Sequence, residues 1–163
     1  MRKRLVLVVG PESSGTRGTT KLLIDNGYWG TTGHRQPLDD FIFLQKPLHE
    51  IVPQNVNKIV LRRSIPHAND YPSLHYTDTQ FLTAGYKTTW LVVLRDLAEL
   101  TRSKVLRKHA RDETQATFDT LYQYNWLFRI LLSKTSGVHF FPYTYHMKNP
   151  SKALEILESF EII

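Results

Sequence analysis

The chain of 163 residues contains no cysteine. This absence excludes disulfide bonds, thiolate nucleophiles and zinc sites that depend on cysteine ligands. It agrees with a reducing compartment, where disulfides are rare, and we expect a cytoplasmic protein. No spacing of histidines and carboxylates is typical of a metal site either, so we expect no metal.

Long hydrophobic runs are also missing from the sequence. The apolar run Leu5–Val9 follows a basic N-terminus, but Pro11 and Glu12 end it before it reaches the length of a signal-peptide core. No other run approaches the roughly 20 apolar residues that a membrane-spanning helix needs. We therefore expect a soluble protein without a membrane partner.

What the sequence does contain is the composition of one globular domain. Hydrophobic residues make up 41% of the chain and charged residues 22%, which is enough apolar material for a packed core. No repeat, low-complexity tract or linker divides the chain, so we expect a single domain over residues 1–163. The net charge of +6 favours anionic partners such as nucleotides.

Apolar, β-branched runs alternate with segments of helical periodicity along the chain. The expected strands are Arg4–Val9, Lys58–Arg62, Thr88–Leu94 and Val138–Tyr143. The expected helices are Arg17–Asn26, Asp39–Gln45, Thr77–Ala84, Leu97–Ala110, Thr114–Ser133 and Ser151–Phe160. This alternation predicts an α/β fold, a three-layer sandwich with a central, mostly parallel sheet, whose ligands bind beyond the carboxyl ends of the strands.

Two of the expected helices carry apolar residues that the pattern places against the core. In the helix 97–110 these are Leu97, Leu100, Val105 and Leu106. In the helix 114–133 the aromatic and aliphatic residues are predicted to pack on the sheet: Phe118, Leu121, Tyr122, Trp126, Phe128 and Leu132.

The loop between the first strand and helix has the parts of an anion-binding site. Gly10 and Gly15 allow a ligand to approach the backbone, and the amides at the start of the helix point toward it. Hydroxyl and guanidinium donors come from Ser13, Ser14, Thr16 and Arg17. The loop departs from the nucleotide-triphosphate motif G-x-x-x-x-G-K-[ST], because Thr16 and Arg17 stand where the motif has Lys and Ser or Thr.

A second candidate group follows the third strand. Arg95 ends this strand, and Ser103 lies eight residues later in the next helix. An arginine can hold a phosphate through two parallel hydrogen bonds and a serine can donate a third, although Arg95 could instead form an ion pair with Asp96. The basic segment 102–111 would draw anions toward this end of the sheet.

Three separated segments together resemble the sulfotransferases that use 3′-phosphoadenosine 5′-phosphosulfate (PAPS). ESSGTRGTTKLL (12–23) resembles their 5′-phosphosulfate loop, VVLRDLAELTRS (92–103) their 3′-phosphate segment, and YTYHMKNP (143–150) a motif near their C-terminus. The resemblance spans most of the chain. It implies a P-loop, sulfotransferase-like fold and an enzyme that transfers a sulfuryl group from PAPS to a hydroxyl or amine acceptor without a metal.

The resemblance also implies roles for individual residues. The 5′-phosphosulfate would lie on Ser13, Ser14, Gly15, Thr16 and Arg17, and the 3′-phosphate on Arg95 and Ser103. Arg17, Arg62 or Arg63 would stabilise the migrating group, and His67 or His34 would accept the acceptor's proton. The chain departs from the family where Ser13 or Glu12 replaces the loop lysine and Ser64 replaces the strand-end histidine.

Two other functions stay open at the level of sequence. One is a P-loop kinase for a nucleotide or small metabolite, which the missing loop lysine disfavours. The other is a catalytically degenerate module that binds nucleotides, or nucleic acid through the basic segment 102–111, although we do not expect a nucleic-acid partner. The motifs define neither the acceptor nor the oligomeric state.

Overall fold

A computed structural model describes residues 3–33, 48–65, 74–134 and 137–163. Its strands are β1 (Arg4–Pro11), β2 (Lys58–Ile65), β3 (Lys87–Leu94) and β4 (Val138–Pro142). Its helices are α1 (Thr16–Asp25), α3 (Leu48–Ile51), α4 (Leu74–Thr83), α5 (Leu97–Leu106), α6 (Glu113–Leu131), α7 (Tyr143–Met147) and α8 (Pro150–Ser159). The helix predicted over Asp39–Gln45 lies outside the described residues.

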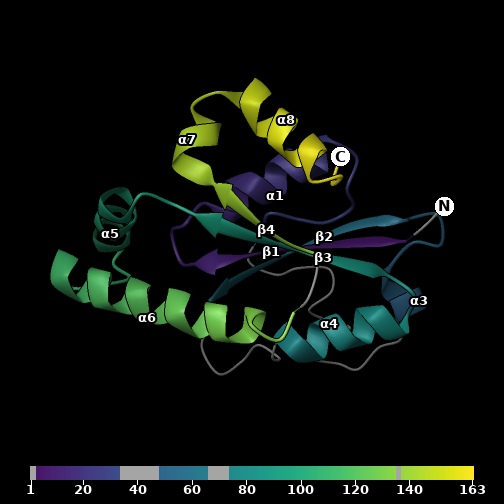
Figure 1. Ribbon diagram of the computed structural model, residues 1–163, viewed down its shortest axis with the longest axis horizontal. Coiled ribbons are helices and arrows are strands. Elements are labelled where there is room, and N and C mark those ends of the chain that lie inside the picture. The colour runs from purple at the N-terminus through teal and green to yellow at the C-terminus, as the bar shows by residue number, and fades with distance from the viewer. Residues whose placement is uncertain (1–2, 34–47, 66–73, 135–136) are drawn as a thin grey trace.

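The four strands form one parallel sheet in the order β2-β1-β3-β4. The chain moves from β1 to one neighbour, then crosses back past β1 to β3 and on to β4. Right-handed crossovers that run in opposite directions place their helices on opposite faces of the sheet. Accordingly, α1, α7 and α8 lie on one face and α4 and α6 on the other (Figure 1). The predicted α/β architecture with a parallel sheet is confirmed.

Strand β1 is the centre of the core. Its residues Leu5–Val9 are each exposed by no more than 1%. Alternate side chains enter different halves of the core, because successive residues of a strand point to opposite faces. Leu5, Leu7 and Val9 pack with Phe81 and Leu127, whereas Val6 and Val8 pack with Leu23 and Leu157. The continuous apolar run therefore reflects burial on both faces.

Strands β1 and β2 are longer than predicted at their carboxyl ends. The pairs Val9↔Arg63, Gly10↔Ser64 and Pro11↔Ile65 continue the parallel ladder beyond Val9 and Arg62. The hydrophobic periodicity did not predict this extension because it contains polar and glycine residues. The backbone hydrogen bonds of the ladder continue there because they do not depend on the side chains. Residues 62–64 therefore lie beside the loop that follows β1.

Helix α5 is shorter than the expected helix 97–110, and of its four residues predicted to face inward only Leu100 is fully buried. The helix ends at Leu106, and Lys108 then adopts a left-handed backbone with φ of 58°. Leu97 and Leu106 are 40% and 78% exposed, so their predicted burial is wrong. Thr101 and Lys104 are buried instead, because α5 packs against α6 through a polar contact between Lys104 and Gln123.

Helix α6 also buries a face that its hydrophobicity does not indicate. The inward residues are Ala116, Thr120, Gln123, Leu127 and Leu131. The aromatic and aliphatic residues predicted to pack on the sheet lie on the outer side, with Phe118 70%, Tyr122 65% and Leu132 85% exposed. That prediction is wrong because α5 and β1 meet the side of α6 that carries the smaller and polar residues.

The C-terminal segment forms two helices where one was expected. Strand β4 ends at Pro142, and Tyr143 opens the short helix α7. Helix α8 begins at Pro150, and the Asn149 side chain accepts a hydrogen bond from the Lys152 amide at its N-terminus. Across the described part of the chain, no helix combines the length and apolar character required to cross a membrane.

Candidate functional site

The loop between β1 and α1 leaves the start of the helix open. The Ser14 amide donates to the Pro11 carbonyl at 3.1 Å, Ser13 has φ of 67°, and Gly15 stands at the N-cap with φ of 105°. No side chain caps α1 within the described residues. The amides of the first helical turn have no acceptor within the helix, and the helix dipole adds partial positive charge. This loop therefore presents free donors at the carboxyl edge of the sheet.

A cleft of about 550 Å³ lies over this helix start. It is lined by cationic side chains from four parts of the chain, together with the carboxylate of Glu12: Arg17, Lys21, Arg62, Arg95 and Arg107. Its volume is in the range of small-molecule sites. Several cations around one cleft attract an anionic ligand and raise its local concentration.

The predicted hydroxyl donors are placed differently from one another. Ser13 and Thr16 line the cleft. Ser14 is fully buried and faces inward. Its Oγ lies close to Gly10: a Cβ on that glycine would be 2.6 Å from the Ser14 Oγ and 2.9 Å from the Val93 carbonyl oxygen. The Ser13 and Ser14 hydroxyls are both buried without a hydrogen-bond partner among the described residues. Of the two residues, Ser13 is the one that lines the cleft.

The Tyr143 ring closes one side of the loop. A Cβ on Gly15 would lie 2.5 Å from this ring, and a Cβ on Gly18 would lie 2.6 Å from its hydroxyl oxygen. The two glycines therefore allow α7 to pack directly on the start of α1. The loop is held by a residue about 130 positions away in sequence, and Tyr143 itself lines the cleft.

Arg95 joins the end of β3 to the same loop. Its Nη1 donates to the Ser13 carbonyl at 2.8 Å, and its Nε lies 3.6 Å from a Glu99 carboxylate oxygen. Its guanidinium carbon lies 5.8 Å from the centre of the Tyr143 ring. The predicted alternative partner, Asp96, instead caps α5 by accepting from the Glu99 amide. Arg95 thus fixes the loop and also lines the cleft.

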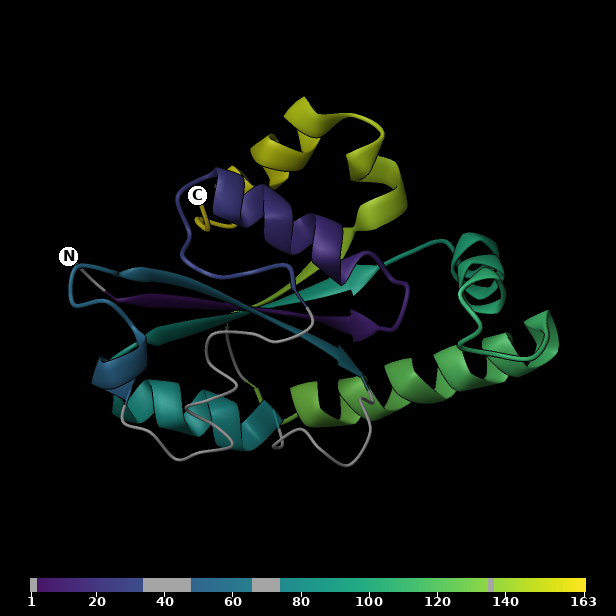
Figure 2. The same ribbon diagram turned by 180° about the vertical axis from the view of Figure 1, so that it is seen from behind.

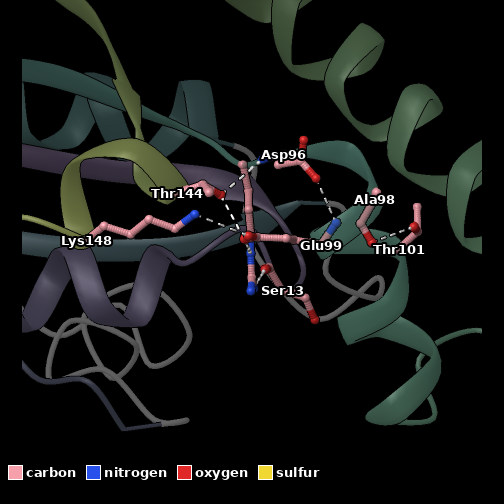
Figure 3. A network of polar contacts seen from close by, with 8 residues as sticks. Ser13, Asp96, Ala98, Glu99, Thr101, Thr144 and Lys148 are labelled. Atoms are coloured by element: carbon pink, nitrogen blue, oxygen red, sulfur yellow. Dashed lines mark hydrogen bonds and ion pairs between the residues drawn. The ribbon is translucent and has the colours of Figure 1, made fainter.

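Thr144 extends this network into the C-terminal segment. Its hydroxyl donates to Glu99 at 3.0 Å and accepts from the Asp96 amide at 3.2 Å, as Figure 3 shows. Lys148 approaches the other Glu99 oxygen at 4.0 Å. The segment that resembles the family's C-terminal motif is therefore bonded to the segment that ends β3.

The two arginines of β2 point to opposite faces of the sheet. Arg62 and Ser64 line the cleft, and an Arg62 nitrogen donates to the Gly33 carbonyl at 2.6 Å. Arg63 is 4% exposed and does not line the cleft. Because side chains alternate along a strand, Arg63 lies on the same face as Leu61 and Ile65, away from α1. Of this pair, only Arg62 can contact a ligand on the loop.

Ser103 is not brought to the cleft. Ser103 is half-buried on α5, outside the cleft lining, and its carbonyl accepts from the Arg107 amide at 3.1 Å. His34 and His67 lie outside the described residues. His109, which we did not predict as a site residue, does line the cleft, with Nδ1 3.7 Å from a Glu12 carboxylate oxygen.

A buried lysine lies behind the cleft wall. Lys104 is 1% exposed and donates to Gln123 at 2.7 Å. Burial lowers the pKa of Lys104, while the carboxylates of Asp119 and Glu12 oppose that shift. Tyr124, which follows Gln123 on α6, donates to the Val93 carbonyl at 3.1 Å. Burial raises the pKa of Tyr124 to about 12. The hydrogen bond of Tyr124 joins α6 to the end of β3.

Sequence reasoning missed several cleft residues because their positions depend on the fold. Lys21, Arg107 and His109 occur in ordinary helical or interhelical sequence, and no spacing marks them. Within the described ranges, no three histidine, aspartate or glutamate residues group as metal ligands.

Comparisons of the chain with models of protein families, with curated proteins and with solved structures give no match. The function therefore has to be argued from the geometry of the cleft and from the three segments identified in the sequence.

Proposed function

We propose that this protein is a sulfotransferase-like enzyme that binds PAPS in the cleft over the start of α1. The observation that carries the proposal is the uncapped helix N-terminus that opens into a cleft of about 550 Å³ lined by five cations. A phosphosulfate is a compact polyanion, and such a site supplies it with backbone amides, a helix dipole and full positive charges at once.

The donor's 5′-phosphosulfate would lie on the loop 13–17. Amides of Gly15, Thr16 and Arg17, with the Ser13 hydroxyl, would donate to its oxygens. The buried, unpartnered Ser13 hydroxyl supports this assignment, because a buried hydroxyl without a partner costs free energy until a ligand supplies one. Arg17 and Arg62 reach the same cleft and would neutralise the remaining charge.

The donor's 3′-phosphate is assigned to Arg95 and Ser103 through the resemblance. Arg95 lines the cleft, and its Nε has no hydrogen-bond partner among the described residues. Ser103 would have to act from α5 beyond the present cleft lining. Arg107, which lines the cleft at the end of α5, is the additional cation we assign to this phosphate.

In the transfer itself, the acceptor oxygen or nitrogen would form a bond to the sulfur of PAPS while the bond from that sulfur to the 5′-phosphate oxygen breaks, and adenosine 3′,5′-bisphosphate would leave. The chain's part is to align the two reactants and to place positive charge around the equatorial oxygens, which Arg17 and Arg62 would do. A proton must leave the acceptor. The resemblance implies His67 or His34 as the base, and among the described residues of the cleft His109 offers an imidazole, whose Nδ1 lies 3.7 Å from a Glu12 carboxylate oxygen.

The test is calorimetric titration with adenosine 3′,5′-bisphosphate and, separately, with ATP and Mg²⁺. We expect the bisphosphate to bind without metal and ATP to bind much more weakly. Preference for Mg-ATP would replace the proposal with a kinase function. Failure of both nucleotides to bind would contradict it and favour a degenerate module.

Substitutions locate the binding within the cleft. Arg17→Ala and Arg95→Ala should each weaken bisphosphate binding about 10- to 100-fold, since a charged hydrogen bond contributes about 1.5–3 kcal/mol. Arg111→Ala is the matched control, because its side chain is 84% exposed outside the cleft. Ser103→Ala tests the 3′-phosphate assignment separately. Equal affinity in all four variants would remove the assigned site.

A further inference from the structure

The outer face of α6 carries an apolar ridge that the described chain leaves largely exposed, although at one end the Phe128 ring meets the Phe140 ring of β4, with centroids 6.2 Å apart. The ridge consists of Phe118, Leu121, Tyr122, Phe128 and Leu132 around Asn125. Its apolar members are between 40% and 85% exposed. Helix α6 forms the outer layer of the molecule below the sheet, on the face opposite α1 (Figures 1 and 2).

The exposed apolar area of the ridge is at the upper end of the range for monomeric proteins. An aromatic side chain presents about 150–250 Å², so the ridge exposes on the order of 600 Å² of apolar side chain. The largest patch on a typical monomer is about 300–600 Å² and is often functional. Two such ridges in contact would bury about 1,200 Å², which is the lower limit for a specific protein interface.

The spacing of the ridge is that of a helix–helix contact. Phe118, Leu121, Asn125, Phe128 and Leu132 follow the alternating three- and four-residue steps of a heptad seam. Of the charged residues in α6, Arg129 borders this face, and its long stem can lie along apolar surface while its guanidinium stays in water. A second helix with the same pattern would fit it.

The position of Asn125 determines which partner fits. It lies seven residues from Phe118 and seven from Leu132, at the centre of the ridge. Against an apolar partner its carboxamide would lose hydrogen bonds to water without replacement, which costs about 1–3 kcal/mol. Against its own copy, each carboxamide can donate to and accept from the other. A single polar residue within such a seam fixes register in this way.

We propose that the ridge of α6 is a homodimer interface, with the two-fold axis passing beside Asn125 and the apolar side chains packed around it. The interface would be isologous, because the same residues face each other from both copies. No residue of α6 is among those that line the cleft, so this dimer leaves the cleft lining uncovered by the interface. The inference does not rest on the proposed function.

The first test is the solution mass of the full chain by sedimentation velocity. The chain has a mass of 19.0 kDa, and we expect a species of twice that mass. Leu132→Glu should convert it to the monomer with an unchanged circular dichroism spectrum, because Leu132 is 85% exposed and does not support the fold. Leu106→Glu, at 78% exposure on α5, is the matched control and should stay dimeric. A monomeric wild type, or equal behaviour of the two variants, would overturn the proposal.

The second test exploits the absence of cysteine from the chain. Asn125→Cys introduces a single thiol beside the proposed axis, so mild oxidation should yield a disulfide-linked dimer. Glu158→Cys places a thiol on an exposed position of α8, across the sheet, and should remain unlinked. A dimer in which Glu158→Cys crosslinks and Asn125→Cys does not would place the interface elsewhere and overturn the assignment.

Discussion

At Gly15 two separate constraints act on a single residue. Its φ of 105° lies in the region that L side chains rarely adopt, and the Tyr143 ring occupies the space that a Cβ would need. The sequence indicated that this glycine lets a ligand approach the backbone. The structure adds a packing reason, because the glycine lets α7 close over the loop.

These constraints predict a graded loss of stability on substitution. Gly15→Ala should lower the free energy of unfolding by more than about 2 kcal/mol, from backbone strain together with the clash. Gly27→Ala should cost only about 1 kcal/mol, because φ there is 87° but nothing lies within 4 Å. Urea denaturation of both variants measures the difference.

The double variant Gly15→Ala with Tyr143→Ala separates the two causes. Removing the ring relieves the clash and leaves the backbone strain, so the added cost of Gly15→Ala should fall to that of Gly27→Ala. If Gly15→Ala costs the same with and without the ring, the packing explanation is wrong.

The sequence predicts which residues belong to the site only where a local motif contains them. Ser13, Gly15, Thr16 and Arg17 belong to one strand–loop–helix segment, and the structure places all of them at the cleft. Arg63 was predicted beside Arg62, yet strand alternation sends it to the opposite face. The predicted strand ended at Arg62, so the sequence did not assign a face of the sheet to Arg63.

At the scale of elements, the α5–α6 contact contains a titratable group. Burial lowers the pKa of Lys104 below its ordinary value of 10.5. Near and below that pH the unfolded chain binds more protons at this position than the folded protein. Stability contributed by Lys104 therefore rises as the pH increases toward 10.5.

Lys104→Met tests this linkage. The variant lacks the unfavourable burial of charge, so its stability relative to wild type should be highest at neutral pH and should decline as the pH approaches 10.5. Chemical denaturation of both proteins at several pH values measures the difference in their free energies of unfolding. The titration of other groups affects both proteins alike and cancels in this difference. A difference that is independent of pH would show that Lys104 is not shifted.

The start of α8 provides a second prediction at this scale. Asn149 accepts from the Lys152 amide at 3.3 Å, and Pro150 follows as the first helical residue. Asn149→Ala should cost about 1 kcal/mol, whereas Ser151→Ala should have little effect because Ser151 lies inside the helix. Thermal unfolding of the two variants distinguishes them. Equal melting temperatures would contradict the assignment of Asn149 as the cap.

For the whole molecule, the distribution of charge matters more than its sum. The net charge is +6, and five cations converge on one cleft. Bisphosphate affinity should therefore fall several-fold between ionic strengths of about 0.01 M and about 0.1 M, as the screening length falls from about 30 Å to about 10 Å. Titrations at both ionic strengths measure this dependence.

The same titrations on two variants locate the charges responsible. Arg17→Ala should show a weaker dependence on salt than wild type, because one of the cleft cations is gone. Arg111→Ala, which removes a cation outside the cleft, should keep the wild-type dependence. An equal salt dependence for all three proteins would contradict a role for the cleft charges.

The sequence by itself determined the α/β class, the parallel sheet and the loop at the start of α1. These features follow from apolar runs, helical periodicity and glycine chemistry, which act over a few neighbouring residues. Only the tertiary structure decided which face of α6 is buried, that Arg63 turns away from the cleft, that His109 enters it, and that Tyr143 closes over Gly15. Each of these depends on contacts between segments distant in sequence, and local periodicity carries no information about which of two possible faces the rest of the chain will meet.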